Sequence, residues 1–262
     1  MPVTDQALLV AAARASGEIA KEFFQKSPGV TDKPDGAGPV TEADLAVNTM
    51  LERMLRAARP DYGWLSEETE DSDARLTTQR QFVIDPIDGT RAFIEGSKDW
   101  AHSLAVVEDG QVVAAAVYMP IRDLMFAARL GAGATVNDQP ARVTSAGLDG
   151  ATVLGAKPNF DPRLWQGGTP PIKRVFRSSL AYRLCLVAQG RFDGMMTLRP
   201  SWEWDIAAGA LIAAEAGGRV TDPAGQSLQF NNPHPQVPGV MAAGPELHEG
   251  LTRRLEPQAA NP

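Results

Sequence analysis

The sequence DPIDGT at residues 85–90 follows a short apolar run, Phe82–Ile84, that is typical of a buried strand. Pro86 has no N–H to donate to a sheet, so we expect the strand to end at Asp85 and the chain to turn there. Such a turn would direct both aspartate side chains and the carbonyl of Ile87 toward one small volume. This stretch therefore predicts a strongly acidic site at a strand end.

Carboxylates held this close repel each other, and either a raised pKa or a bound cation relieves the repulsion. Gly89 and Thr90 follow at the predicted start of a helix, where free backbone N–H groups attract anions such as phosphate. The same six residues are also typical of an ordinary surface turn with Pro at its second position. Other parts of the chain must decide between the two interpretations.

The composition is that of a folded globular protein. The chain has 262 residues, of which 44% are hydrophobic and 22% charged, enough for one large domain or two ordinary ones. The net charge of −7 argues against a surface that binds a nucleic-acid polymer. One cysteine, Cys185, excludes an internal disulfide framework, and we find no signal peptide or membrane-spanning segment. We expect a cytoplasmic protein that does not bind membranes.

The first half of the chain predicts helices packed on an antiparallel sheet. Apolar residues recur at helical spacing over residues 5–25, and Thr41 with Asp44 has the spacing of a capping box at a second helix. Between them, residues 27–39 are predicted to form a connecting loop. Asp109-Gly110 joins two alternating stretches and is a strong hairpin signal. A short strand at residues 63–65 precedes two acids that we expect to be solvated, Glu67 and Glu68.

The second half alternates strands and helices, which predicts a mostly parallel or mixed sheet. The sequence DIAAGALIAAEAGG predicts a helix with Asp205 as its N-cap and a glycine pair at its end. The composition turns small and polar at residues 145–150. We therefore predict an N-terminal α+β domain at residues 1–145 and a C-terminal α/β domain at residues 146–262.

Four separated motifs, in this order, carry a resemblance: VTEAD at 40–44, SEE at 66–68, DPIDGT at 85–90, and WD at 204–205 opening an Ala-rich helix that ends in EAGG. Each alone is weak, but the set resembles the inositol monophosphatase superfamily of metal-dependent phosphomonoesterases. The resemblance covers most of the chain. It implies the layered αβαβα sandwich of that superfamily and of fructose-1,6-bisphosphatase, a mixed α+β and α/β fold.

The resemblance implies a site for two or three Mg²⁺ ions. The first ion would be held by Glu67, Asp85 and the Ile87 carbonyl, and the second by Asp85, Asp88 and Asp205. These hard oxygen ligands suit Mg²⁺, and no His or Cys cluster suits zinc. No other cofactor is expected.

The resemblance also implies the reaction, in which metal-activated water attacks phosphorus. Glu67 and Thr90 would orient or deprotonate that water, with Asp44 behind Thr90. Lys33 resembles a family lysine that helps to place a metal. The expected substrate-binding residues are Asp88, Gly89, Thr90, Ser178, Arg183, Arg199 and Asp205.

The substrate is expected to be a small phosphorylated metabolite. Inositol monophosphatases resemble one another in a Glu between the last strand and the WD motif, where this chain has Thr197, Leu198 and Arg199 and no matching Glu before Trp202. The EWD variant is more similar to the bacterial 3′(2′),5′-bisphosphate nucleotidase branch, which converts adenosine 3′,5′-bisphosphate to AMP, and Arg183 or Arg199 could meet the second phosphate.

Two alternative enzyme functions are inositol-1-monophosphatase and histidinol-phosphatase. A more remote alternative is a non-catalytic binding protein with the same fold. The resemblance also allows a homodimer. The motifs themselves do not decide between these functions.

Overall fold

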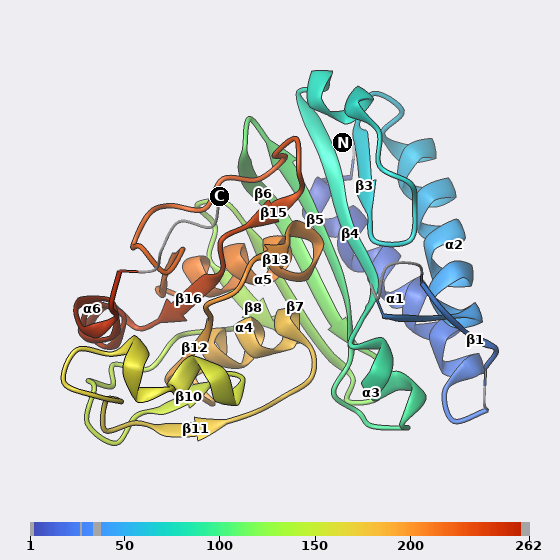
Figure 1. Cartoon of the computed structure of the whole chain (residues 1–262). Coiled ribbons are helices and arrows are strands. Elements are labelled where there is room, and N and C mark those ends of the chain that lie inside the picture. The colour runs from blue at the N-terminus through green and yellow to red at the C-terminus, as the bar shows by residue number, and fades with distance from the viewer. Residues whose placement is uncertain (1–2, 27, 34–37, 258–262) are drawn as a thin grey trace.

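The computed structural model describes residues 3–26, 28–33 and 38–257, which form five alternating layers of helix and sheet (Figure 1). A helix pair covers a seven-stranded sheet, a second helix pair lies between this sheet and a five-stranded one, and a last helix covers the outer face. This is the layered architecture predicted from the sequence. The helices are α1 Asp5–Phe23, α2 Glu42–Ala58, α3 Thr90–Ile94, α4 Leu180–Ala188, α5 Glu203–Glu215, α6 Pro245–Arg254, with 3₁₀ turns η2 Asp73–Thr77, η3 Lys157–Phe160 and η4 Pro162–Leu164.

The first sheet has its strands in sequence order, and every neighbouring pair is antiparallel except β3 and β4. The prediction of a purely antiparallel sheet was wrong at this edge. The parallel pair matters for the site, because strands that run the same way end side by side. The strands are β3 Gly63–Ser66, β4 Arg80–Asp88, β5 Ala101–Glu108, β6 Gln111–Met119, β7 Leu124–Arg129, β8 Ala134–Val136 and β9 Gln139–Pro140.

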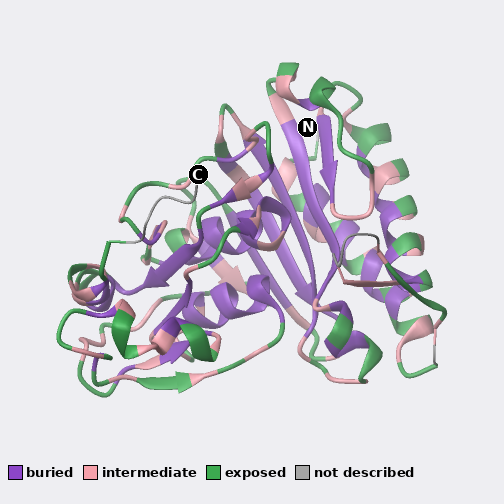
Figure 2. Ribbon diagram, viewed as in Figure 1, coloured by how far each residue is buried: buried purple, intermediate pink, exposed green. Residues whose placement is uncertain are grey.

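Alternation along β4 explains how the first sheet holds a helix layer on each face. Phe82 and Ile84 pack in the core under α1 and α2, whereas Val83 packs in the core shared with α4 and α5. Successive side chains of a strand point to opposite faces, so an apolar residue at every position buries both faces. The result is a central sheet covered on both sides (Figure 2).

The second sheet is mixed, as predicted. Four of its strands run in one direction, and the fifth runs antiparallel between two of them. In sheet order the strands are β11 Lys173–Val175, β10 Thr152–Leu154, β12 Gly194–Thr197, β16 Val240–Ala243 and β14 Arg219–Thr221. Two further antiparallel pairs lie outside the main sheets, namely β1 Val30–Asp32 with β2 Pro39–Thr41, and β13 Ser201–Trp202 with β15 Gln236–Val237.

Helix α5 is the middle of the molecule. Residues 206–213 are all buried, because the helix packs on the first sheet, on α4 and on the second sheet (Figure 2). A helix that is apolar on every side is stable only in such a position. Gly209 permits the contact with α4, since a Cβ there would lie 2.7 Å from Cβ of Leu184.

Several local predictions need correction. Strand β4 continues past Asp85 to Asp88. Trp202, and not Asp205, is the N-cap of α5. The predicted connecting loop contains β1 and β2, and its residues 27 and 34–37 lie outside the described residues. Within the described ranges, no helix has the length and apolar character needed to cross a membrane.

Candidate active site

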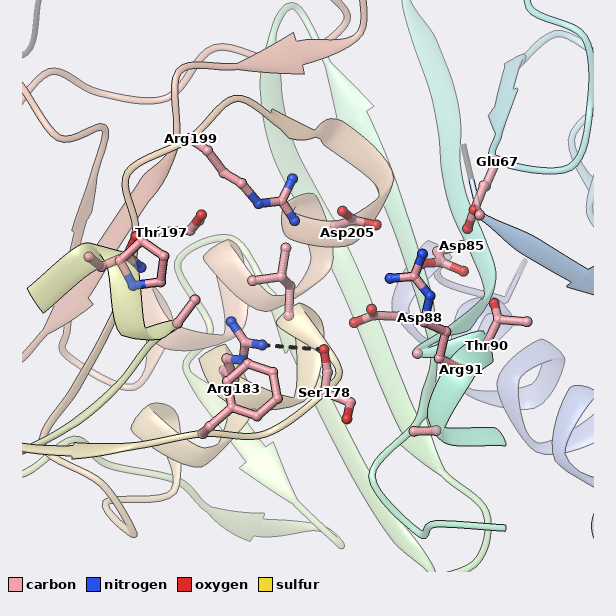
Figure 3. Close-up of a pocket in the computed structure, with 18 of the residues that line it drawn as sticks. Glu67, Asp85, Asp88, Thr90, Arg91, Ser178, Arg183, Thr197, Arg199 and Asp205 are labelled. Carbon is pink, nitrogen blue, oxygen red and sulfur yellow. Dashed lines mark hydrogen bonds between the residues drawn. The ribbon is translucent and has the colours of Figure 1, made fainter. Parts of the chain in front are cut away.

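A cavity of about 860 Å³ opens at the end of β4, between the first sheet, α3, and the N-terminal ends of α4 and α5. Figure 3 shows Glu67, Asp85 and Thr90 on one side, Arg183 and Arg199 on the other, and Asp205 between them. Asp88, Gly89 and Ser178, which were also predicted, line this cavity too, whereas the predicted Asp44 and Ile87 are not among its lining residues. Residues far apart in the sequence thus meet in one place.

A bulge in β4 explains how two aspartates three residues apart face the same way. Asp85 pairs with Ser103 and Asp88 with Ala101, so β4 has one residue more than β5 between these pairs. An extra residue reverses the alternation of side chains, which brings both carboxylates to one face of the sheet. Pro86 fits the bulge because it has no N–H, and its carbonyl contacts Nδ1 of His102.

Asp85, Asp88 and Asp205 each place a carboxylate oxygen within 4.8 Å of the other two. Oδ1 of Asp85 is buried and has no hydrogen-bond partner among the described residues. Burial, followed by the charges of Glu67 and Asp88, raises the pKa of Asp85 well above its usual range. Burial also raises the pKa of Asp205, with Asp88 as the next contribution. The positive charges of Arg183 and Arg199 offset this repulsion only in part, because the pKa values of all three aspartates stay raised.

Asp88 is oriented by the start of α4. Its Oδ2 accepts hydrogen bonds from Oγ of Ser179 and from the backbone N–H of Ala181, both at 2.6 Å. Burial raises the pKa of Asp88 to about 6, although these donors favour the ionised form. One carboxylate oxygen is therefore fixed by α4, and α4 joins the second half of the chain to the site.

Glu67 reaches the cavity from the parallel edge strand. The backbone N–H of Glu67 donates to the carbonyl of Ile84 at 3.2 Å, because β3 and β4 end side by side. Nζ of Lys33 lies 2.7 Å from a carboxylate oxygen of Glu67 and of Glu68. The two acids are therefore paired and largely buried, and the expectation that they are solvated was wrong.

The pKa values around Lys33 follow from this pairing. Burial, followed by the charge of Glu67, raises the pKa of Glu68 to about 7. Burial alone would lower the pKa of Lys33, but the two glutamates outweigh it and leave that pKa raised. Lys33 therefore carries its charge into the edge of the acidic cluster.

Asp44 connects a helix cap to the site. As predicted, Thr41 and Asp44 form a capping box at α2, in which Oδ2 of Asp44 accepts from the Thr41 N–H at 2.9 Å. The other oxygen, Oδ1, accepts from Oγ1 of Thr90 at 3.3 Å, and Oγ1 also lies 3.2 Å from the Ile87 carbonyl. Burial raises the pKa of Asp44. Gly89 makes the turn before Thr90 with a φ of +103°, which favours glycine.

The opposite wall of the cavity is positively charged. Arg183 is almost buried, and its Nε donates to the Arg177 carbonyl at 2.6 Å while Nη2 donates to the Ser178 carbonyl at 3.4 Å. Burial lowers the pKa of Arg183 to about 10, so the side chain is still charged at neutral pH. Arg199 is exposed and follows Thr197 and Leu198 along the wall.

A separate buried network holds the segment that enters α5. Glu203 accepts from the backbone N–H groups of Asn231 and Asn232 at 2.7 and 2.9 Å, and from the Asn232 side chain at 2.8 Å. Arg75 donates to Oδ1 of Asn231 and to the carbonyls of Asn232 and Pro233. Because Glu203 lies two residues before Asp205, this network fixes the start of the helix that carries Asp205.

Some cavity residues were missed by sequence reasoning. Phe176, Asn159 and Arg91 all line the cavity. Arg91 follows DPIDGT directly and could have been found from its position. Phe176 lies in a loop and Asn159 in η3, neither segment carries a recognisable motif, and only the fold brings them to the cavity.

The donor set fits a hard divalent cation. Three carboxylates converge, one buried oxygen lacks a partner, and all the available ligand atoms are oxygens. A layered sandwich with such a cluster at a strand end defines a class of hydrolytic proteins that act with divalent metal ions.

Comparison with known proteins identifies the family. The model of the inositol monophosphatase family matches residues 2–259. Inositol monophosphatase 2 of Solanum lycopersicum is 33% identical, over 84% of this chain and 88% of the relative. The Nus factor SuhB of Pasteurella multocida is 31% identical, over 94% and 93%.

A solved structure agrees with these sequence matches. The extragenic suppressor protein suhB of Bartonella henselae has a TM-score of 0.79 and 30% identity, and the match covers 94% of this chain and 96% of that one. The chain belongs to the inositol monophosphatase family, whose members are metal-dependent phosphatases that act on small phosphorylated substrates.

Proposed function

We propose that this protein is a Mg²⁺-dependent phosphomonoesterase that hydrolyses a small phosphorylated metabolite. The observation that carries the proposal is the buried cluster of Asp85, Asp88 and Asp205, in which one oxygen has no partner among the described residues and nearby arginines offset the negative charge only in part. Burying like charges together costs free energy, and a bound cation offsets that cost. The family match independently supports phosphatase activity.

The residues that would hold Mg²⁺ are those expected from the sequence. Glu67, Asp85 and the Ile87 carbonyl would hold one ion, and Asp85, Asp88 and Asp205 would hold a second. The proposal is for two or three ions in total. When bound, the ions would polarise the phosphoryl group and lower the pKa of a bound water. The carbonyl of Ile87 is directed by the β4 bulge, next to Oγ1 of Thr90.

Glu67, Thr90 and Asp44 would handle the attacking water. Oγ1 of Thr90 donates a hydrogen bond to Asp44, so its lone pairs are left to accept a hydrogen bond from water. Glu67 lies across the cavity edge and would orient the same water. Phosphate oxygens would be met by the N–H groups of Gly89 and Thr90.

The substrate that we propose is adenosine 3′,5′-bisphosphate, which the enzyme would convert to AMP. Support comes from the wall opposite the carboxylates, where Thr197, Leu198 and Arg199 offer no acid to bind inositol hydroxyls. Arg183 and Arg199 provide positive charge for a second phosphate, with Ser178 beside them. The cavity of about 860 Å³ accommodates a nucleotide as well as a sugar phosphate, so its size does not discriminate.

Inositol 1-phosphate is the second candidate substrate. The observation in its favour is the similarity to a relative named inositol monophosphatase 2. A substrate with one phosphate and several hydroxyls would leave Arg199 without a partner, which is why we rank it second.

A substrate panel tests both levels of the proposal. Phosphate release is measured with Mg²⁺ from adenosine 3′,5′-bisphosphate, inositol 1-phosphate, histidinol phosphate and fructose 1,6-bisphosphate, with a chelator as the control. We expect Mg²⁺-dependent release with the highest kcat/KM for the bisphosphate nucleotide. Preference for inositol 1-phosphate would overturn the substrate, and no release from any ester would favour a non-catalytic binding protein.

Location and assembly are part of the same proposal. We expect a cytoplasmic enzyme, for which the resemblance allows a homodimer, and which binds neither membranes nor nucleic-acid polymers. Cell fractionation and light scattering on the purified protein test the first two expectations.

A further inference from the structure

The cavity has an apolar end that the proposed chemistry does not use. Its lining there includes Ala156, Pro158, Leu164 and Phe176. Phe176 is 48% exposed, and among the described residues it is the one aromatic side chain in the set of exposed large hydrophobic residues. An aromatic ring left open to solvent inside a cavity is an unpartnered contact surface.

Phe176 packs against the guanidinium of Arg183. The guanidinium carbon of Arg183 lies 4.6 Å from the centroid of the ring, and Arg183 is itself almost buried. Two hydrogen bonds fix Arg183, from Nε to the Arg177 carbonyl and from Nη2 to the Ser178 carbonyl, the second of which is drawn in Figure 3. A fixed cation therefore supports the ring, and its remaining exposed surface is available to a ligand.

The ring also lies at a useful place relative to the carboxylates. Arg183 connects the two ends of the cavity, because Asp88 is close enough to raise its pKa while burial lowers it. Figure 3 shows Arg183 on the side of the cavity opposite Glu67 and Asp85. A ligand whose phosphate is held at the acidic cluster would direct the rest of its structure toward Phe176.

We propose that Phe176 is a specificity-determining residue that stacks on the base of a purine nucleotide, with Arg183 as its support. This inference rests on the proposed function and adds to it the residue that selects for the base. A planar base offers a π-face to the ring, whereas inositol has none, so the contact favours nucleotides over inositol phosphates.

The test compares Phe176→Leu with a matched control. Phe192 is the control because it also packs against an arginine, with the guanidinium carbon of Arg177 5.6 Å from its ring centroid, but it does not line the cavity. The quantity measured is the ratio of kcat/KM for adenosine 3′,5′-bisphosphate to that for inositol 1-phosphate. We expect Phe176→Leu to lower this ratio about 5- to 10-fold, mainly through KM, and Phe192→Leu to leave it at the wild-type value.

A binding experiment keeps the inference separate from the proposed function. Calorimetry with Mg²⁺ compares AMP with ribose 5-phosphate for the same proteins, and Phe176→Leu should weaken AMP binding about 5- to 10-fold more than ribose 5-phosphate binding. If the wild type hydrolyses esters but Phe176→Leu leaves the kcat/KM ratio unchanged, stacking is overturned and the phosphatase survives. If no ester is hydrolysed, the proposed function fails and the difference in AMP binding alone decides for or against stacking.

Discussion

Two buried polar clusters lie two residues apart in the sequence and differ in how their charges are balanced. Around Glu203, each carboxylate oxygen accepts hydrogen bonds from Asn231 or Asn232, and Arg75 binds the same segment. Around Asp205, three carboxylates converge and an oxygen of Asp85 has no partner among the described residues. The first cluster is complete within the protein, whereas the second is the one at which we propose a bound metal ion.

The difference teaches which buried charges serve stability and which serve function. A satisfied network contributes to the fold and loses that contribution when one member is removed. A cluster of like charges costs stability, and the protein retains it for what it binds. Removing a charge should therefore have opposite consequences at the two places.

The largest effect is expected from Asp85→Asn. Loss of the carboxylate shared by both metal positions should lower kcat/KM by about 1,000-fold or more, corresponding to about 4 kcal/mol. In the presence of a chelator, the unfolding temperature of the variant should equal or exceed that of the wild type, because one of the repelling charges has been removed. Phosphate release and thermal unfolding measure the two parts. Asp138→Asn, at an exposed turn, is the matched control, and retained activity in Asp85→Asn would contradict the metal assignment.

Glu203→Ala should have the opposite profile. It leaves three N–H groups without an acceptor and removes the negative charge near Arg75, so the free energy of unfolding should fall by about 3 kcal/mol. Urea denaturation measures this, and Glu203→Gln, which keeps one acceptor oxygen, should lose less. If Glu203→Ala kept its stability and lost activity as Asp85→Asn does, the proposed difference between a stabilising cluster and a functional cluster would be contradicted.

Adding Mg²⁺ should stabilise the folded protein through the Asp85 cluster and not through the Glu203 network. At a Mg²⁺ concentration about 100 times its Kd, binding to the folded state alone adds about 2.7 kcal/mol to the free energy of unfolding. For a chain of this size we expect Tm to rise by roughly 5–10 °C. Thermal unfolding with and without a chelator measures the shift, which should persist in Glu203→Gln. The interpretation fails if Asp85→Asn shows the same shift as the wild type.

His248 offers a smaller test in a third environment, where burial disfavours the charged form of a histidine. Nε2 of His248 lies 2.9 Å from Oγ1 of Thr221, and burial, followed by the charge of Arg219, lowers its pKa to about 4. The unfolded chain binds this proton near pH 6.5, so the stabilising contribution is present above that pH and is lost as pH falls toward 4.

The contribution lost between pH 7 and pH 5 is about 1–2 kcal/mol. His248→Gln should flatten the fall in unfolding free energy over this range, as measured by urea denaturation at each pH. An equal fall in the wild type and the variant would show that His248 is not the group responsible.

Local sequence patterns were sufficient for most of the fold. The capping box of Thr41 and Asp44 and the hairpin at Asp109-Gly110 depend on neighbouring residues only, and the structure contains both. The β4 bulge was not predicted, because Pro86 indicates an interruption but not whether pairing resumes after it. Resumption depends on β5, which presents Ala101 to Asp88.

The candidate site was predictable where motifs mark it. Resemblance supplied Asp85, Asp88 and Asp205, which the fold brings together. The pairing of Glu68 with Lys33 and the cavity position of Phe176 depend on contacts across loops, and no spacing rule encodes those. The domain boundary near residue 145 and the catalytic roles stay predictions.

The burial of the middle of α5, residues 206–213, has a consequence for motion. Its amide hydrogens can reach solvent only when the layers around it separate, so they should exchange with deuterium at rates set by global unfolding. Strand β1 is exposed along its whole length and should exchange early. Asp205 would then belong to the helix that opens most slowly, whereas Lys33 directly follows a strand that opens early.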